Sequence, residues 1–325
     1  MNYTIFGESH GPAIGVTLTG VPAGLVWDLD FIRSELARRR PGQSALTTPR
    51  SEADEPEVLS GVFEGRTTGT HLCAVIRNTD TRSKDYSRLK VCPRPGHGDY
   101  AGFVRYAGYN DYRGGGHFSG RLTAPLVFAG AVAKLILRER GVEVGARISL
   151  LYGTPDPTPE QVEQIILAAK AEGDSVGGEI SCAVTGLPAG LGAPDYGCNV
   201  EGIFAQHLFA VPAVKGIAFG AGFAFGSMKG SQANDPFYMD GDTVKTRTNH
   251  AGGINGGITN GMPVTFSVVI RPTPSISRQQ DTVDLSAGKD TKLNVQGRHD
   301  PCILPRALPV IEAAAALAAC DVLGI

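Results

Sequence analysis

The sequence of 325 residues lacks most features of secreted, membrane-spanning and metal-binding proteins. Its six cysteines form no C-x-x-C pair and no dense disulfide pattern, and its first ten residues contain no apolar signal segment. No apolar run reaches the ~18 residues of a membrane span, and no H-E-x-x-H or similar spacing predicts a metal site. We therefore expect a cytoplasmic protein with reduced thiols, outside the membrane and without a structural metal.

Charge is also scarce, since 19% of the residues are charged and the formal net charge is −2. This balance argues against a protein built mainly to bind nucleic acid. The basic residues are nevertheless clustered, with three adjacent arginines at 38–40 and several more between Arg94 and Arg121. Local arginine clusters in a nearly neutral protein favour a small anionic ligand. The hydrophobic fraction of 42% predicts a sizeable core.

Two segments recur in the same order along the chain. TGVPAGL at Thr19–Leu25 returns as TGLPAGL at Thr185–Leu191. More loosely, Thr68-Gly69 and Asn260-Gly261 each precede an apolar run that ends in Val-Ile-Arg. We infer an internal duplication, with two topologically similar halves.

Hydrophobic periodicity predicts an α+β domain over residues 1–325, with halves of about 1–145 and 150–325 and helices that cover sheets. Strands are expected at Ala13–Thr19, Leu72–Arg77, Glu143–Leu151, Glu179–Thr185, Val214–Phe219 and Val264–Ile270. Helices are expected from Asp28 or Asp30 to Arg40, and at Ser119–Arg140, Thr158–Ala171, Asn199–Ala210 and Pro305–Leu323.

Gly7-Glu8-Ser9-His10-Gly11 fits G-x-S-x-G, the nucleophile elbow of serine hydrolases. An elbow needs a strand that leads into the serine and a sheet already built around it, and only six residues precede Gly7, so we expect no central elbow strand. His10 is predicted to lie in a loop, where an imidazole can approach a ligand and titrate near neutral pH. A serine hydrolase using Ser9 and a different enzyme using His10 both remain open from these residues.

Glycine-rich loops carry many of the clustered cations. RPGHGDY at 94–100 presents Arg94 and His97 on one turn. RGGGHFSGR at 113–121 precedes a predicted helix, where free amides can meet an anion and Ser119 can cap the helix. No Gly-Lys-Ser/Thr follows, so this loop is not a Walker A motif.

Two further loops could hold an anion. RPTPS at 271–275 places one cation and two hydroxyls at the end of a predicted strand, which makes it a candidate phosphate site. GRHDP at 297–301 groups Arg298, His299 and Asp300 just before the last predicted helix. This group is either an exposed polar turn or a cluster that holds an anion beside a carboxylate.

Together these motifs resemble the chorismate synthase family over essentially the whole chain. The family's motifs occur here in its order, as FGESHG, RRRPGQS, SGVFEG-x-TTGT, NTDTRSKDY, RPGHGDY, DYRGGG, GDSVGG, GLPAGLG, AVKG, GSQAND, NHAGGI and GRHDP. The resemblance implies a β-α-β sandwich with internal pseudo-twofold symmetry. It also implies a lyase that eliminates phosphate from 5-enolpyruvylshikimate 3-phosphate to give chorismate, with reduced FMN required but no net redox change.

The resemblance implies that Arg39, Arg94 and Arg121 bind this substrate, with Arg113 as a weaker candidate and Ser9 as a hydroxyl contact. A substrate with one phosphate and two carboxylates needs such permanently charged donors.

Three catalytic residues are implied by the same resemblance. His10 would act as an acid toward the departing phosphate, and His97 would support negative charge at the N1/O2 edge of the reduced flavin. Asp300 would lie near flavin N5 and help it accept the C6 proton. Implied cofactor-binding residues are His117, Phe118, Ser119, Ala213, Gly256, Arg271, Pro272, Thr273, Pro274, Ser275 and Arg298.

The family usually forms a homotetramer of two tight dimers, and its flavin is reduced either by NADPH or by an external flavin reductase. This chain departs from the family at several positions. Ala45 stands where many members have arginine, His117-Phe118 replaces a frequent Arg-Ser, and Pro212 replaces a frequent asparagine. Arg271 replaces a frequent lysine and keeps its charge.

Overall fold

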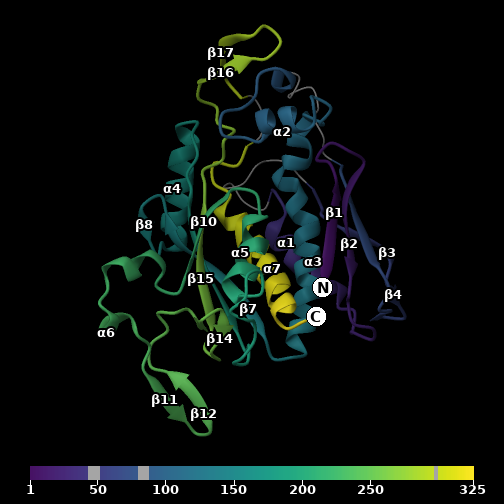
Figure 1. Cartoon of the computed structure of the whole chain (residues 1–325). Coiled ribbons are helices and arrows are strands. Elements are labelled where there is room, and N and C mark those ends of the chain that lie inside the picture. The colour runs from purple at the N-terminus through teal and green to yellow at the C-terminus, as the bar shows by residue number, and fades with distance from the viewer. Residues whose placement is uncertain (43–51, 80–87, 296–298) are drawn as a thin grey trace.

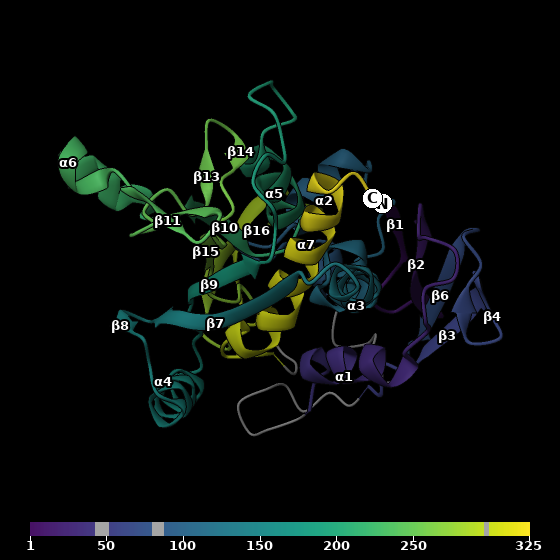
Figure 2. The same cartoon turned by 90° about the horizontal axis from the view of Figure 1, so that it is seen from below.

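The computed structural model describes residues 1–42, 52–79, 88–295 and 299–325. Two antiparallel sheets enclose a layer of helices, as Figure 2 shows when the molecule is seen from below. Helices α1, α3, α5 and α7 lie between the sheets, and α4 lies beside the edge strand β8 of the second sheet (Figure 1). This arrangement confirms the expected α+β class and β-α-β sandwich.

The first sheet has the strand order β1-β2-β6-β3 and the second the order β10-β15-β9-β7-β8. The strands of the first sheet are β1 (Asn2–Gly7), β2 (Ala13–Thr19), β6 (Leu72–Arg77) and β3 (Pro56–Ser60). Those of the second are β10 (Val214–Phe219), β15 (Val264–Ile270), β9 (Gly178–Thr185), β7 (Glu143–Leu151) and β8 (Thr154–Pro155). Short two-stranded pairs are β4 (Val62–Phe63) with β5 (Arg66–Thr67), β11 (Phe237–Asp240) with β12 (Thr243–Thr246), β13 (Ile254–Asn255) with β14 (Ile258–Thr259), and β16 (Gln280–Asp284) with β17 (Lys289–Leu293).

The predicted helices are present at nearly the predicted bounds. They are α1 (Leu29–Arg39), α3 (Thr123–Arg138), α4 (Pro159–Ala171), α5 (Val200–Phe209) and α7 (Leu304–Val322), joined by the short α2 (Asp99–Arg105) and α6 (Gly230–Ala233). The side chains of Asp28, Thr158 and Asn199 cap α1, α4 and α5. The helix predicted from Ser119 becomes α-helical only at Thr123. The residues before it, Gly120–Leu122, form a short 3₁₀ turn that is capped by the Ser119 side chain.

The two sheets repeat one pattern of strands and helices. In chain order β1, β2, α1, β3, β6 and α3 correspond to β7, β9, α5, β10, β15 and α7, and β8 with α4 is inserted after β7. The registers also match: Asn2–Thr19 corresponds to Glu143–Thr185, and Leu18–Leu72 corresponds to Val184–Val264. The predicted internal repeat is therefore a repeat of hydrogen-bond register as well as of sequence.

The recurring TG-x-PAGL turn makes the same hydrogen bonds in both copies. The Thr67 hydroxyl accepts from the Leu25 amide at 3.0 Å, and the Thr259 hydroxyl accepts from the Leu191 amide at 2.9 Å. Each hydroxyl also donates to the proline carbonyl three residues before that leucine, at 2.5 Å and 2.7 Å. Because β7 corresponds to β1, it is the first strand of the second half. We therefore propose a boundary at 139–142, just before β7. The predicted division at about 145–150 would fall inside that strand.

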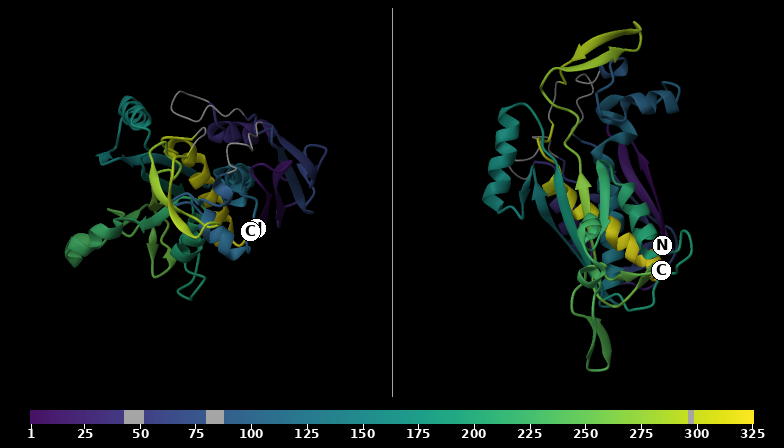
Figure 3. Two further views of the ribbon diagram at one scale, coloured as in Figure 1. Left: turned by 90° about the horizontal axis from the view of Figure 1, so that it is seen from above. Right: turned by 60° about the vertical axis from the view of Figure 1, so that its left-hand side comes forward.

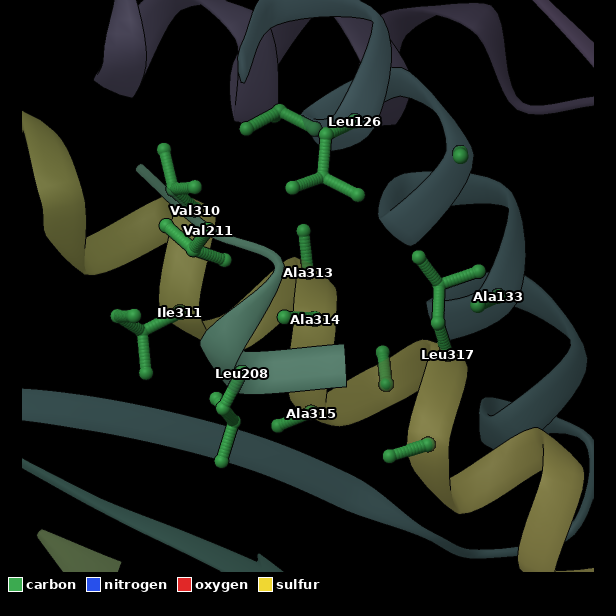
Figure 4. Packing of buried hydrophobic residues seen from close by; sticks show 14 of the residues in the cluster. Leu126, Ala133, Leu208, Val211, Val310, Ile311, Ala313, Ala314, Ala315 and Leu317 are labelled. Carbon is green, nitrogen blue, oxygen red and sulfur yellow. The ribbon is translucent and has the colours of Figure 1, made fainter. Parts of the chain in front are cut away.

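The core lies where α3 and α7 cross between the sheets. Figure 4 shows Ala313 and Leu317 of α7 packed toward Leu126 and Ala133 of α3. Small residues allow this close approach: a Cβ added to Gly130 would lie 2.2 Å from Cβ of Ala313. The segment Gly120–Arg138 is long and apolar enough to cross a membrane, but 89% of its apolar window is buried in the fold, as in a core helix of a soluble protein.

Several strands were not predicted from the sequence, among them β1. It leads directly into the Ser9 motif, but as the edge strand of its sheet and not as the central strand that an elbow needs. Its half-buried alternation was overlooked because the strand is short and mixes polar with apolar residues. An arm made of α6, β11 and β12 also projects from the body, opposite the β16–β17 hairpin (Figure 3).

Candidate active site

One cavity of about 740 Å³ lies at the end of the sandwich where α3 and α7 begin. Corresponding elements of the two halves line it: the ends of α1 and α5, and the starts of α3 and α7. The N-termini of two long helices therefore face one space, and their free amides and dipoles favour an anion there.

The cavity brings together most of the residues predicted from sequence. It is lined by His10, His97, Asp300, Arg39, Arg94, Arg121, His117, Phe118, Ser119, Ala213, Arg271, Thr273, Pro274 and Ser275. Four predicted residues do not line it: Ser9, Arg113, Gly256 and Pro272. Gly256 lies in the β13–β14 turn. Arg298 and Ala45 fall outside the described residues.

The glycine-rich segment 113–118 separates the two predicted catalytic histidines. Gly114, Gly115 and Gly116 all have positive φ, at 60°, 83° and 53°. A Cβ on Gly114 would lie 2.4 Å from Cδ2 of His10, whereas one on Gly115 would lie 3.3 Å from Cε1 of His97. Glycine is required here because the loop passes directly between both imidazole rings.

His97 is oriented by a carboxylate that sequence reasoning overlooked. Its Nδ1 lies 2.6 Å from Oδ1 of Asp99, so an Nδ1–H donor leaves Nε2 as the other polar atom of the ring. Asp99 also accepts from the Arg94 side chain at 2.7 and 2.8 Å and from its backbone amide at 3.0 Å. Arg94 Nη1 in turn donates to the Ser275 hydroxyl at 3.0 Å. This network fixes the 94–99 turn against the 271–275 loop.

The charge state of Asp99 follows from that network. Burial disfavours its ionised form, but hydrogen bonds from Arg94 and His97 outweigh burial and hold the pKa of the carboxyl well below its usual range. Asp99 is therefore a permanent anion at neutral pH. It compensates the charge of Arg94, which is only 6% exposed.

Arg39 and Arg121 share a second buried carboxylate. Arg39 Nη1 donates to Oδ2 of Asp54 at 2.6 Å, and Arg121 Nη1 donates to the other oxygen, Oδ1. The Arg39 Nε also donates to Thr123 at 3.1 Å, and Arg121 Nε donates to Asn78 at 3.1 Å. One carboxylate thus holds two guanidinium groups side by side at the wall of the cavity.

The charged form of Arg39 is disfavoured in this wall. Burial lowers the pKa of the Arg39 guanidinium to about 9; Asp54 opposes this shift, and the nearby Arg306 and Arg121 add to it. An anion bound in the cavity would relieve this repulsion and stabilise all three charges. Asp54 itself has φ of 54°, a strained value for a non-glycine residue, which its two arginine partners hold in place.

Asp300 pairs with a residue that the sequence did not single out. Its Oδ2 accepts from Arg306 Nη1 at 2.5 Å, while Arg306 Nε donates to the Arg39 carbonyl at 3.0 Å. Arg306 lies in the first turn of α7 and links the carboxylate to the end of α1. Lys215 also lines the cavity and was not predicted as a site residue, and so does His299, which the sequence analysis grouped with Asp300.

The serine of the G-x-S-x-G motif is fully buried. Its Oγ has no hydrogen-bond partner among the described residues, and a Cβ on Gly114 would lie 2.9 Å from it. A hydrolase nucleophile must instead be exposed at the top of its elbow. The geometry therefore gives no support to the serine hydrolase alternative.

Comparison with known proteins decides the family. The family model described as chorismate synthase matches residues 1–323. The chain belongs to the chorismate synthase family. Chorismate synthase of Methanothermobacter thermautotrophicus is 46% identical, covering 98% of this chain and 91% of that protein. The Chitinophaga pinensis protein of the same name is 47% identical, covering 98% and 92%.

The solved structures agree with this family. A crystal structure of chorismate synthase covers 99% of this chain and 91% of its own, with a TM-score of 0.77 at 27% identity. As a member of the chorismate synthase family, the chain is a lyase of chorismate formation in the shikimate pathway, acting on a small anionic substrate. This assignment replaces the serine hydrolase alternative.

Proposed function

We propose that this enzyme eliminates phosphate from 5-enolpyruvylshikimate 3-phosphate by a 1,4-anti-elimination that requires reduced FMN. The observation that carries the proposal is the convergence of three buried arginines and two histidines on one cavity. Arg39, Arg94 and Arg121 would bind the substrate anions, because each is already held in place by a carboxylate.

His10 would supply the acid of the reaction. Departure of phosphate develops negative charge on its bridging oxygen, and a protonated imidazole at the cavity wall can neutralise that charge. Ser9 and Arg113, directly beside this wall, would support the loop that carries His10. His97 would support negative charge at the N1/O2 edge of the reduced flavin, and Asp300 would help to accept the proton that leaves C6 of the substrate.

The 271–275 loop at the cavity wall fits a flavin phosphate. Thr273 Oγ1 is buried without a hydrogen-bond partner among the described residues, and it lines the cavity with Arg271 and Ser275. A phosphate would satisfy this hydroxyl. His117, Phe118, Ser119, Ala213, Pro272, Pro274 and the unplaced Arg298 would complete the FMN site, with Gly256 as a more distant candidate. The chemistry that reduced FMN would supply in this site is a transient donation of electron density during loss of phosphate.

We further propose a cytoplasmic homotetramer. The projecting arm exposes large apolar side chains, including Phe237 (67%) and Met239 (62%) of β11, which would be covered by a second copy. Either NADPH or an external flavin reductase would keep the cofactor reduced.

The decisive experiment is an anaerobic assay of phosphate release from 5-enolpyruvylshikimate 3-phosphate. We expect release only when reduced FMN is added, and no release with oxidised FMN alone. Well-folded protein that releases no phosphate with reduced FMN would refute the proposal.

A further inference from the structure

Four charged side chains meet away from the catalytic cavity, where α1 and α3 of the first half contact α7 of the second (Figure 2). They are Glu35 and Arg38 of α1, Lys134 of α3 and Glu312 of α7. The side chains of Glu35, Lys134 and Glu312 are 9%, 11% and 4% exposed, and that of Arg38 is 41% exposed. None of the four lines the catalytic cavity, and the proposed mechanism uses none of them.

Glu312 is the member of this cluster that joins the two halves of the chain. It accepts from Arg38 Nη1 at 2.6 Å and from Arg38 Nη2 at 2.7 Å, one bond to each carboxylate oxygen. Its Oε2 also accepts from Lys134 Nζ at 2.7 Å, and its Oε1 accepts from the backbone amide of Ala146 at 3.2 Å. Because Ala146 lies on β7, one carboxylate ties α1 and α3 to α7 and to the first strand of the second half.

Glu35 binds the same two cations from within the first half. Its Oε1 accepts from Arg38 Nη1 at 2.9 Å, and its Oε2 accepts from Lys134 Nζ. Glu35 alone cannot balance two cations, and Glu312 supplies the second negative charge. Burial disfavours the ionised form of Glu312, but the hydrogen bonds and charges of Arg38 and Lys134 outweigh burial and lower the pKa of its carboxyl.

Stability alone does not account for such a cluster. Desolvation of buried ions often cancels their attraction, so apolar side chains of similar volume would join the helices equally well or better. What the ions add is a fixed geometry. The two parallel N–H···O bonds between Arg38 and Glu312 restrict how α1 can be placed against α7.

That placement matters for the next residue, Arg39, which lines the catalytic cavity. Its carbonyl oxygen accepts from Arg306 Nε, also on α7, at 3.0 Å. α7 therefore holds the last turn of α1 at two points, from Glu312 to Arg38 and from Arg306 to Arg39. The Arg39 guanidinium donates to Asp54, which belongs to the first half, so a shift of this turn would strain that contact and move the guanidinium.

We propose that Glu312 is a positioning residue for Arg39: by binding Arg38 from α7, it sets where the last turn of α1 lies at the cavity wall. Glu312 does not line the cavity, so it acts through α1. The consequence for substrate binding rests on the function proposed above. The placement of Arg39 is a property of the folded protein alone.

The first test therefore needs no activity. Glu312→Gln keeps the shape of the side chain but removes the charge that holds Arg38, whereas Glu35→Gln removes a charge from the same cluster and leaves the link to α7 intact. In protein with isotope-labelled arginine, the Nε–H resonance of Arg39 can be assigned by its loss in Arg39→Lys. It should shift in Glu312→Gln and stay near its wild-type position in Glu35→Gln. Equal shifts in both variants, or no shift in either, would overturn the proposal.

The second test uses the proposed reaction, at a temperature where every variant is folded. KM for 5-enolpyruvylshikimate 3-phosphate should rise roughly tenfold in Glu312→Gln. We expect little change in kcat, because the cluster lies away from His10. Glu35→Gln should keep the wild-type KM even though it also lowers Tm. An unchanged KM in folded Glu312→Gln, or an equal rise in Glu35→Gln, would refute a role beyond stability.

The route through Arg39 is tested in an Arg39→Met background, where the addition of Glu312→Gln should raise KM no further. A second rise of the same size there would overturn that route. If Glu312→Gln fails to fold, Arg38→Gln breaks the same link from its more exposed partner and takes its place in each test, with the same expected results. An inactive wild type would refute the proposed function but leave the resonance test of Arg39 readable.

Discussion

Gly114→Ala is expected to damage catalysis far more than it damages the fold. Gly114 has φ of 60° and ψ of 14°, in the left-handed region, where a side chain costs about 1–2 kcal/mol. The added Cβ would also lie 2.4 Å from Cδ2 and 2.5 Å from Nε2 of His10. Ordinary carbon contacts are ~3.5 Å or longer, so the imidazole must move by roughly 1 Å. A displacement of that size typically costs about 10²-fold in rate.

Gly24→Ala separates the two effects. Gly24 has φ of 85°, but nothing lies within 4 Å of its added Cβ, and it does not line the cavity. Both variants should lose a few degrees of Tm, while only Gly114→Ala should lose about 10²-fold in kcat/KM for anaerobic phosphate release. Wild-type turnover in a folded Gly114→Ala, or an equal loss in Gly24→Ala, would refute the placement of His10.

Three further predictions follow from the core and the arginine clusters. Gly130→Ala should lower the free energy of unfolding by about 1–3 kcal/mol by overpacking α3 against Ala313, despite alanine's higher helix propensity; an unchanged Tm would contradict this packing. Asp99→Asn should destabilise the protein by about 3–5 kcal/mol at neutral pH by stranding Arg94. Because the pKa of Asp99 is lowered, that difference should shrink as pH falls below about 4, and a pH-independent difference would exclude the ion pair as its cause. Arg39→Lys keeps the charge but cannot hold Asp54 and Thr123 together, so KM for the anionic substrate should rise roughly tenfold, with an unchanged KM counting against Arg39 as a ligand.

The repeat could be predicted from sequence because its turn depends on local chemistry. Glycines at positive φ and a hydroxyl that bonds two backbone groups are needed wherever this turn occurs, so the same letters return in both halves. The Val-Ile-Arg match is less regular. Ile76 faces Ile14 next to the end of its ladder, whereas Ile270 faces Gly178 at the very end of its own. The recurring turn sequence therefore predicted that the two halves repeat, but the Val-Ile-Arg match did not predict which residues of the paired strands correspond.

The partners of the site residues could not be predicted in the same way. Asp54 belongs to no motif that the sequence analysis used. It matters because Arg39 and Arg121, which are distant in sequence, donate to its two carboxylate oxygens. Asp99 stood inside RPGHGDY, and its spacing from Arg94 and His97 on one turn was a usable signal. Arg306 could not be predicted as a site residue from sequence. A positive charge in the first turn of a helix interacts unfavourably with the helix dipole, and only the structure shows that Arg306 pairs there with Asp300.

The duplication also explains how one cavity gathers cations from both halves of the chain. Corresponding helix ends frame it, but their side chains have diverged: α1 ends with Arg39 at the cavity wall, whereas α5 ends at the apolar Phe209 and Ala210. The second half supplies cations on β10, after β15 and in the first turn of α7, at Lys215, Arg271 and Arg306. Arg306 donates to the Arg39 carbonyl, so cations of the two halves meet at the cavity wall. A cavity with cations from both halves suits the proposed substrate and cofactor, which each carry a phosphate.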